Sequence, residues 1–430
     1  MLQLKFFIAG YYGYKNLGDE LYLLKILNDI KKLFPFSEFY IWSADKNFSK
    51  EFLKDYNVKI VDRYNPSETV NSIKTSDVVI LGGGGLIHEY YGLKVESLFK
   101  NFGYDVPSYA IPALIGKIFN KKVFYWGLGH GPVVTEEGLE FSRWFYSLAD
   151  VITLRDPFSY YAVKKLLPEK EEIYLDSDPL LNFDFNKYQE KTEKGILGIS
   201  VRKWFNDEIF IETIVQVLND IIKETSIKIF PIPCDLLLDK EITSKFSKLI
   251  PKEHLIEKDF NSIDEVIKGI SICEWFIGMR LHSLITAYKL RKPLLAISYD
   301  AKVEEFMKEI KGDYIKITDF SKGEIFFKIK NLLTSKPLPI KEFSYKTPEI
   351  FEKFLNKGKE DLPKKEVIDF INNSENLEDK EKVYLRDFVK TLFLQREELY
   401  GKINVLNNVL TKIKGEKNEL LEKIKRLEEE

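Results

Sequence analysis

Short apolar segments of strand length alternate with amphipathic helical segments through the first part of the chain. The strand candidates are residues 4–9, 38–42, 58–61, 78–81, 122–126, 151–154 and 173–175. Segments between them, such as 19–33 and 138–149, have apolar residues at helical spacing. Continuous apolar strands separated by helices are typical of a parallel sheet covered on both faces. The pattern therefore predicts an α/β fold with a doubly wound sheet.

A second series of the same kind follows a polar segment at residues 184–194. Its strand candidates are residues 195–201, 228–232, 275–277, 294–297 and 314–317. We therefore predict two tandem doubly wound, Rossmann-like domains, at residues 1–186 and 187–335. Two such domains in tandem resemble the glycosyltransferase-B architecture.

Beyond residue 335 the strand pattern stops, and helical sequence rich in Lys and Glu follows. Leucine or isoleucine recurs every seven residues, at Leu392, Leu399, Leu406, Ile413, Leu420 and Leu427. This spacing predicts a helical linker at 336–380 and a coiled coil at 381–430. Arg396 and Lys417 at the second core position favour a parallel homodimer. One long amphipathic helix packed on its own domain is the alternative.

The composition of the chain limits which binding partners and which cellular compartment we expect for this protein. With 65 basic and 67 acidic residues among 430, the net charge is −2, so no global field favours nucleic acid or an anionic membrane. Cys234 and Cys273 lie in apolar segments and are expected to be buried free thiols. We see no targeting or membrane-spanning segment. We expect a cytoplasmic protein that meets the inner face of the membrane only through its substrate.

The strongest candidate site lies where strands end and helices begin in the second series. Arg280, His282 and Ser283 follow the strand at 275–277, and Lys302 follows the strand at 294–297. Ligands bind at such strand ends because side chains and free helix N–H groups converge there. Cations beside an imidazole suit an anionic substrate whose reaction needs a proton. A histidine that only caps its helix is the alternative.

Two further arginines stand at strand ends. Arg155 follows the strand at 151–154, and Arg202 closes the strand at 195–201. A guanidinium in this place can bind phosphate or carboxylate through two hydrogen bonds. A surface ion pair, such as Arg155 with Asp156, is the alternative.

Glycine-rich loops follow three strands of the first series. They carry Asn16, Gly18, Asp19 and Glu20; the run Gly82–Gly85, with Gly83, Gly84 and then His88; and His130. Glycines permit positive φ and close approach of backbone amides to a ligand. The spacing matches neither a dinucleotide fingerprint nor a P-loop. The loops favour a cleft lining; a simple turn capped by Asp19 and a hydrogen-bonded loop histidine at 130 are the alternatives.

In this order and spacing, the motifs resemble the polysaccharide pyruvyl transferase family. The residues that carry the resemblance are Asn16, Gly18, Asp19, Glu20, Gly82–Gly85, Arg155, Asp156, Gly278–His282 and Tyr299–Lys302. The resemblance implies a glycosyltransferase-B-like fold and transfer of a pyruvyl unit from phosphoenolpyruvate to two hydroxyls of a cell-surface polysaccharide sugar or its precursor. It implies that Arg155, His282 and Lys302 serve the donor, and that the domain at 187–335 is the donor side. Asp19 and the glycine loops of the domain at 1–186 would face the acceptor.

The chemistry of this reaction assigns expected roles. We expect His282 to act as general acid or base, and Asp19 or Glu20 to take a proton from an acceptor hydroxyl. Donor ligands are expected at Arg155, Arg202, Arg280, Ser283 and Lys302, and acceptor contacts at Asn16, Glu20, Gly83, Gly84, His88 and His130. We expect no metal and no cofactor, with phosphoenolpyruvate as co-substrate. The acceptor glycan is expected to be free or lipid-linked.

Two other functions stay open at this point. A nucleotide-sugar glycosyltransferase would share the fold, and binding of uridine or guanosine diphosphates would identify it. A non-catalytic scaffold for polysaccharide assembly would use the C-terminal helix. Fold alone does not separate these functions.

Overall fold

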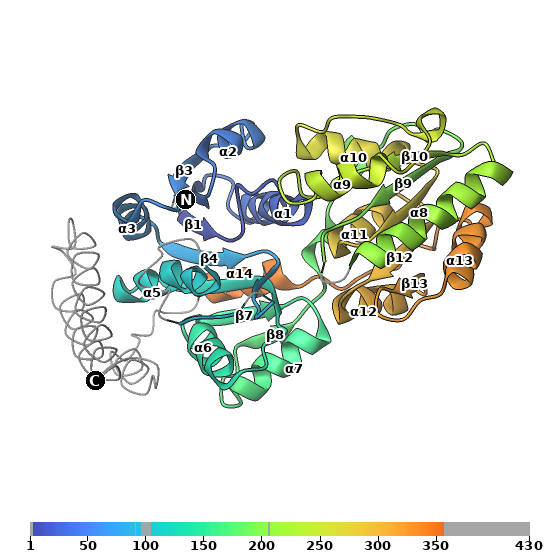
Figure 1. Ribbon diagram of the computed structural model, residues 1–430. Helices are drawn as coiled ribbons and strands as arrows, with labels where there is room; N and C mark the ends of the chain where they lie inside the picture. The colour runs from blue at the N-terminus through green and yellow to red at the C-terminus, as the bar shows by residue number, and fades with distance from the viewer. Residues whose placement is uncertain (1–2, 91, 96–104, 205–206, 357–430) are drawn as a thin grey trace, which may run out of the picture. The chain divides into compact units, whose positions relative to one another are not determined.

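The computed structural model divides the chain into two compact units and describes residues 3–90, 92–95, 105–204 and 207–356 (Figure 1). The first unit comprises the chain up to Tyr11, Ile26–Ser177 and the described residues from Lys346 onward. The second comprises Tyr12–Lys25 and Asp178–Tyr345. Each unit has a parallel sheet with helices, which confirms the predicted α/β architecture.

Eight described strands form the sheet of the first unit, in the order β3-β2-β1-β4-β6-β7-β8, with β5 beside β6. Their bounds are Lys5–Ala9 (β1), Glu38–Ser43 (β2), Val58–Asp62 (β3), Val78–Gly82 (β4), Gly85–Ile87 (β5), Lys122–His130 (β6), Val151–Leu154 (β7) and Ile173–Leu175 (β8). The connecting helices are α1 (Leu17–Leu33), α2 (Lys46–Phe52), α3 (Pro66–Thr75), α5 (Ala110–Ile118), α6 (Glu136–Ser147) and α7 (Pro157–Leu166). All seven strands predicted for this part are confirmed, and the central strands β1, β4, β6 and β7 are almost entirely buried.

The chain returns to the first unit through α14 (Thr347–Asn356). The Asp176 carboxylate accepts the backbone N–H groups of Lys346, at 2.8 Å, and Thr347, at 2.6 Å, and so fixes the start of this helix. Phe351 is fully buried, with its ring centroid 4.9 Å from that of Phe124. The predicted helical linker at 336–380 is therefore wrong in its described part: residues 336–346 are not helical, and α14 is a packed element of the first unit.

Five described strands form the sheet of the second unit, in the order β10-β9-β11-β12-β13. Their bounds are Ile196–Ser200 (β9), Lys228–Pro231 (β10), Trp275–Gly278 (β11), Leu294–Ser298 (β12) and Asp313–Lys316 (β13). The helices are α8 (Asp207–Glu224), α9 (Lys240–Ser247), α10 (Ile263–Ile272), α11 (Leu281–Lys289), α12 (Ala301–Glu309) and α13 (Lys322–Thr334). All five strands predicted for this part are confirmed. Cys234 and Cys273 are buried free thiols, as predicted.

The division into units differs from the predicted limits at 186 and 335. Residues 12–25 pack with the second unit, where the N–H of Leu17 donates to the carbonyl of Cys234 at 2.8 Å. Helix α1 therefore begins in the second unit and ends in the first. The predicted coiled coil at 381–430 lies outside the described residues. No helix in the described part of the chain combines the length and hydropathy needed to span a bilayer.

Candidate active site

The carboxyl edge of the second sheet gathers the polar residues of this unit. Strands β9, β10, β11 and β12 are parallel, so the residues that follow each strand lie along one edge. These residues are Arg202 after β9, Asp235 after β10, Arg280 and His282 after β11, and Tyr299 and Lys302 after β12.

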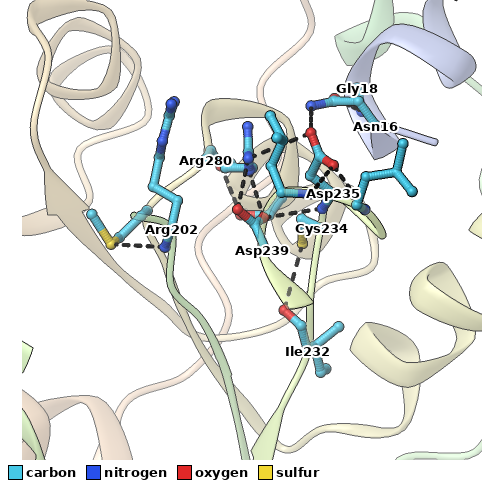
Figure 2. Close-up of polar contacts among 12 residues, drawn as sticks. Asn16, Gly18, Arg202, Ile232, Cys234, Asp235, Asp239 and Arg280 are labelled. Atoms are coloured by element: carbon cyan, nitrogen blue, oxygen red, sulfur yellow. Dashed lines mark hydrogen bonds and ion pairs between the residues drawn. The ribbon is translucent and has the colours of Figure 1, made fainter. Parts of the chain in front are cut away.

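Arg280 is held by two buried carboxylates (Figure 2). Its Nε and Nη2 atoms donate to Asp239 at 2.6 and 2.7 Å, and Nη2 lies 3.5 Å from Asp235. Burial alone would lower the pKa of Arg280, but these carboxylates outweigh it and hold the pKa above the ordinary value. The bidentate pair fixes the turn between β11 and α11.

The loop before α1 is joined to the same acid cluster. The side-chain amide of Asn16 donates to Asp235 at 3.1 Å, and its Oδ1 accepts the N–H of Gly18 at 3.0 Å (Figure 2). Asn16 therefore caps α1 and ties it to the residues that hold Arg280. This loop was predicted to lie on the acceptor side, in the first domain; in the structure it belongs to the second unit.

Glu20 lies fully buried beneath this loop. Its Oε1 accepts the N–H groups of Gly13, at 2.9 Å, and Lys15, at 3.1 Å. Burial raises the pKa of Glu20 to about 8. The predicted contact of Glu20 with an acceptor is corrected, because its side chain supports the loop from inside. Asp19 is half-buried in the first turn of α1.

His282 stands in the first turn of α11, between three groups of the second unit. Its Nε2 lies 3.4 Å from Oδ2 of Asp178. The ring of Tyr22 meets it edge-on, with centroids 5.4 Å apart, and the backbone of Gly18 lies against Nδ1. Only 14% of the imidazole side chain is exposed. Asp178 was not among the predicted site residues. An Asp directly before a proline is typical of a helix N-cap. Oδ1 of Asp178 does cap the short helix Pro179–Asn182.

Arg202 lies between two aromatic rings. Its Cζ is 5.0 Å from the ring centroid of Trp204 and 4.8 Å from that of Tyr299, and Nη1 donates to the Tyr299 hydroxyl at 2.9 Å. Nζ of Lys302 lies 5.7 Å from the Tyr299 ring centroid and 3.2 Å from Oδ2 of Asp300. Cation–π contacts of this kind orient a guanidinium without neutralising it.

Ser283 does not face this cluster as a free hydroxyl. The side chain is fully buried, and its Oγ donates to the carbonyl of Arg280 at 2.6 Å. The expected donor contact of Ser283 is corrected, because the hydroxyl stabilises the first turn of α11.

The remaining predicted residues lie in the first unit. Arg155 follows β7, is 7% exposed, and has its Nε 3.8 Å from Asp156. The ion pair named as its alternative is therefore present, but its arginine is buried and not at the surface. A Cβ on Gly129 would lie 2.9 Å from Nε of Arg155. Gly83 and Gly84 have positive φ, at 88° and 73°, which favours glycine there.

Two histidines lie close to these glycines along the chain. The N–H of His130 donates to Oγ of Ser159 at 2.8 Å, and its Nδ1 lies 3.3 Å from the Tyr146 hydroxyl. Burial lowers the pKa of His130 to about 4, so its ring is neutral at pH 7. These contacts agree with the alternative interpretation, in which His130 is a hydrogen-bonded loop residue. His88 packs its ring 4.8 Å from that of Tyr90.

Residues 16–301 match the sequence model of polysaccharide pyruvyl transferases. The chain belongs to the polysaccharide pyruvyl transferase family. The match spans the carboxyl edge of the second sheet from Arg202 to Asp300 and stops one residue before Lys302. No curated protein matches the chain.

Solved structures with similar folds include enzymes of UDP-sugars. MnaA of S. aureus with UDP is 10% identical, with a TM-score of 0.56, and the alignment covers 84% of this chain and 99% of MnaA. HepE of Anabaena with UDP and glucose is 12% identical, with a TM-score of 0.51, over 78% and 90%. The UDP-GlcNAc 2-epimerase of Neisseria meningitidis is 11% identical, with a TM-score of 0.52, over 83% and 100%. At this identity the likeness extends to the fold alone.

Besides Glu20 and Ser283, six of the predicted site residues belong to the second unit of this pyruvyl transferase family member: Asn16, Asp19, Arg202, Arg280, His282 and Lys302. Sequence reasoning missed the residues that hold them, chiefly Asp178, Asp235, Asp239 and Tyr22. In the described part of the chain, no group of three or more His, Cys, Asp or Glu side chains has the arrangement of a metal site.

Proposed function

We propose that this protein transfers the pyruvyl group of phosphoenolpyruvate to a sugar of a cell-surface polysaccharide or its precursor. The products are a pyruvate ketal, which bridges two hydroxyls, and inorganic phosphate. The observation that carries the proposal is the family match over 16–301, which includes the strand-end cluster of Arg202, Arg280 and His282.

The positively charged side chains of the cluster differ in whether they are available to bind phosphoenolpyruvate. Arg280 is already paired with two carboxylates and serves to fix the strand end. Arg202 is held by ring faces and a phenol, so its guanidinium keeps its charge for an anion. Lys302, 28% exposed, shares this edge with Arg202. We assign the phosphate and carboxylate of the donor to Arg202 and Lys302. Arg155, a donor ligand in the family resemblance, stays a prediction.

Ketal formation needs one proton at the methylene carbon of the donor, and two acceptor hydroxyls must each lose one. An imidazole beside a carboxylate is suited to accept a proton, because the carboxylate stabilises the imidazolium that forms. We therefore assign His282, with Asp178 as its positioning residue, to the removal of a hydroxyl proton. Asp19 is the second carboxylate at this corner and stays a candidate for the same task. No cofactor enters the proposed reaction, and the acceptor is a glycan, free or lipid-linked.

A nucleotide-sugar glycosyltransferase is the second candidate, because two of the similar structures contain UDP. Thermal stabilisation of the protein by uridine diphosphate, with none by phosphoenolpyruvate, would favour it. Dimerisation through residues 381–430 remains a separate proposal. Light scattering of the full chain tests it, and a monomeric mass would contradict it.

The test of the proposed function is phosphate release from phosphoenolpyruvate with candidate glycans, together with the mass increase of the acceptor. We expect His282→Ala and Lys302→Ala to lose most of the activity, because a positioned acid or base contributes about 10²–10⁴ in rate. Lys308→Ala, on the exposed side of the same helix as Lys302, is the matched control and should keep full activity. Full activity in both site variants would contradict the assigned site.

A further inference from the structure

Tyr299 occupies the centre of the cationic part of the site. It follows β12 directly, and its hydroxyl oxygen accepts a hydrogen bond from Nη1 of Arg202 at 2.9 Å. Its ring meets that of Trp204 with centroids 4.6 Å apart. Nζ of Lys302 lies 5.7 Å from its ring centroid. The phenol is therefore held in one orientation by rings and charges on several sides.

The charges around Tyr299 make its hydroxyl more acidic than an ordinary phenol. Burial alone would raise the pKa of Tyr299, but Lys302, Arg202 and Arg280 outweigh burial and lower it. The Asp300 carboxylate opposes them only in part. Three positive groups favour the phenolate over the phenol, because opposite charges stabilise the ionised form.

The hydroxyl also has a proton to give. Its oxygen is the acceptor of the Arg202 hydrogen bond, so the O–H bond itself points elsewhere. Among the described residues, the bond from Arg202 is the hydrogen bond that this hydroxyl makes. A phenol that accepts from a guanidinium, with its own proton unused and cations on either side, has the arrangement of a proton donor to a bound anion.

We propose that Tyr299 is the catalytic residue that protonates the methylene carbon of phosphoenolpyruvate. This inference rests on the proposed function. The O–H bond of Tyr299 breaks and a C–H bond forms at the methylene carbon, which becomes a methyl group. The positive charge that develops at the neighbouring carbon is met by an acceptor hydroxyl, and the phenolate is stabilised by Arg202 and Lys302.

The other protons balance this step. The first acceptor hydroxyl bonds to the cationic carbon and gives its proton to His282. The second hydroxyl then displaces the phosphate, and its proton leaves with the phosphate as hydrogen phosphate. The proton on His282 returns through solvent to the Tyr299 phenolate, which completes the cycle. The acidified phenol thus supplies the acid, and the carboxylate-paired imidazole supplies the base.

Tyr299→Phe tests the inference, because it keeps the ring and removes only the hydroxyl. We expect kcat to fall by about 10²–10⁴-fold, while calorimetry shows that phosphoenolpyruvate still binds. Tyr314→Phe is the matched control, because Tyr314 lies in β13 at the other end of the neighbouring strand, with Nζ of Lys328 5.9 Å from its ring centroid, and it is not assigned to the site. It should keep the wild-type kcat. Retained binding also shows that Tyr299→Phe is folded.

Ultraviolet titration gives a second measurement that needs no substrate. The difference between wild type and Tyr299→Phe should contain one tyrosine that ionises at lower pH than an ordinary tyrosine. If the wild type transfers pyruvate and Tyr299→Phe does so equally fast, the inference is overturned and the proposed function stands. If the wild type releases no phosphate with any acceptor, the proposed function itself has failed, and the inference fails with it.

Discussion

Gly18 and His282 lie in direct contact, although they stand near opposite ends of the residues that match the family, 16–301. A Cβ on Gly18 would overlap Nδ1 of the imidazole and would lie 2.9 Å from the Cβ of His282. The absence of a side chain at position 18 is therefore a steric requirement of the histidine. From the sequence pattern, this glycine was expected only to allow a tight turn in its loop.

Gly18→Ala should displace the His282 ring and reduce phosphate release by at least about 10²-fold, the lower range for loss of a positioned acid or base. Gly323→Ala is the control, since nothing lies within 4 Å of a Cβ at that helical position. Alanine there should stabilise the protein by about 1 kcal/mol without changing activity. Equal activity in both variants would show that the Gly18 contact does not matter.

Asp178→Asn should lower kcat, because the variant loses the carboxylate that lies 3.4 Å from Nε2 of His282 and orients the ring. The fall should be no larger than that expected for loss of the base itself, about 10²–10⁴-fold. The KM for phosphoenolpyruvate should stay unchanged, because Asp178 holds the imidazole and not the donor. Asp184→Asn, at an exposed position of the same segment, should keep the wild-type kcat. Equal kcat in both variants would remove the positioning role of Asp178.

Asp239→Ala should destabilise the second unit strongly. It leaves the Arg280 guanidinium, whose side chain is 13% exposed, without its bidentate partner. Breaking a buried ion pair from one side costs about 3–5 kcal/mol. Urea unfolding measures this loss. Glu241→Ala, which removes an exposed pair with Lys245, is the control and should have no measurable effect. A similarly small effect in Asp239→Ala would mean that Arg280 needs no fixed partner.

Glu20→Gln should change how stability depends on pH. Burial raises the pKa of Glu20 from its ordinary value of 4.5 to about 8. Between these two pH values the carboxyl is protonated in the folded protein and ionised in the unfolded chain. Wild-type stability therefore falls between pH 4.5 and pH 8, by about 1.4 kcal/mol per unit from this group. Glutamine does not ionise, so the free energy of unfolding of the variant should rise relative to wild type over this window. Parallel pH profiles in urea unfolding would show that Glu20 ionises freely in the folded state.

The strands and the positions of the strand-end residues could be predicted from the sequence, because both follow from local patterns. A continuous apolar run marks a buried parallel strand. Parallel strands end at a common edge, so the prediction that Arg280, His282 and Lys302 lie along one edge needed no knowledge of packing.

Only the tertiary structure decided what each of these side chains contacts. Asp178 reaches His282, and Asp239 neutralises Arg280, across sequence separations that leave no periodic signal. Glu20 lies in a motif beside residues of the site, yet the fold buries it and turns it toward its own loop. The Asp176 carboxylate holds the start of α14 in the first unit, and nothing in the sequence of the helix itself indicates this contact. Local propensity acts over one turn or one strand, whereas burial and charge pairing are properties of the assembled core, and so they become visible only when the chain has folded.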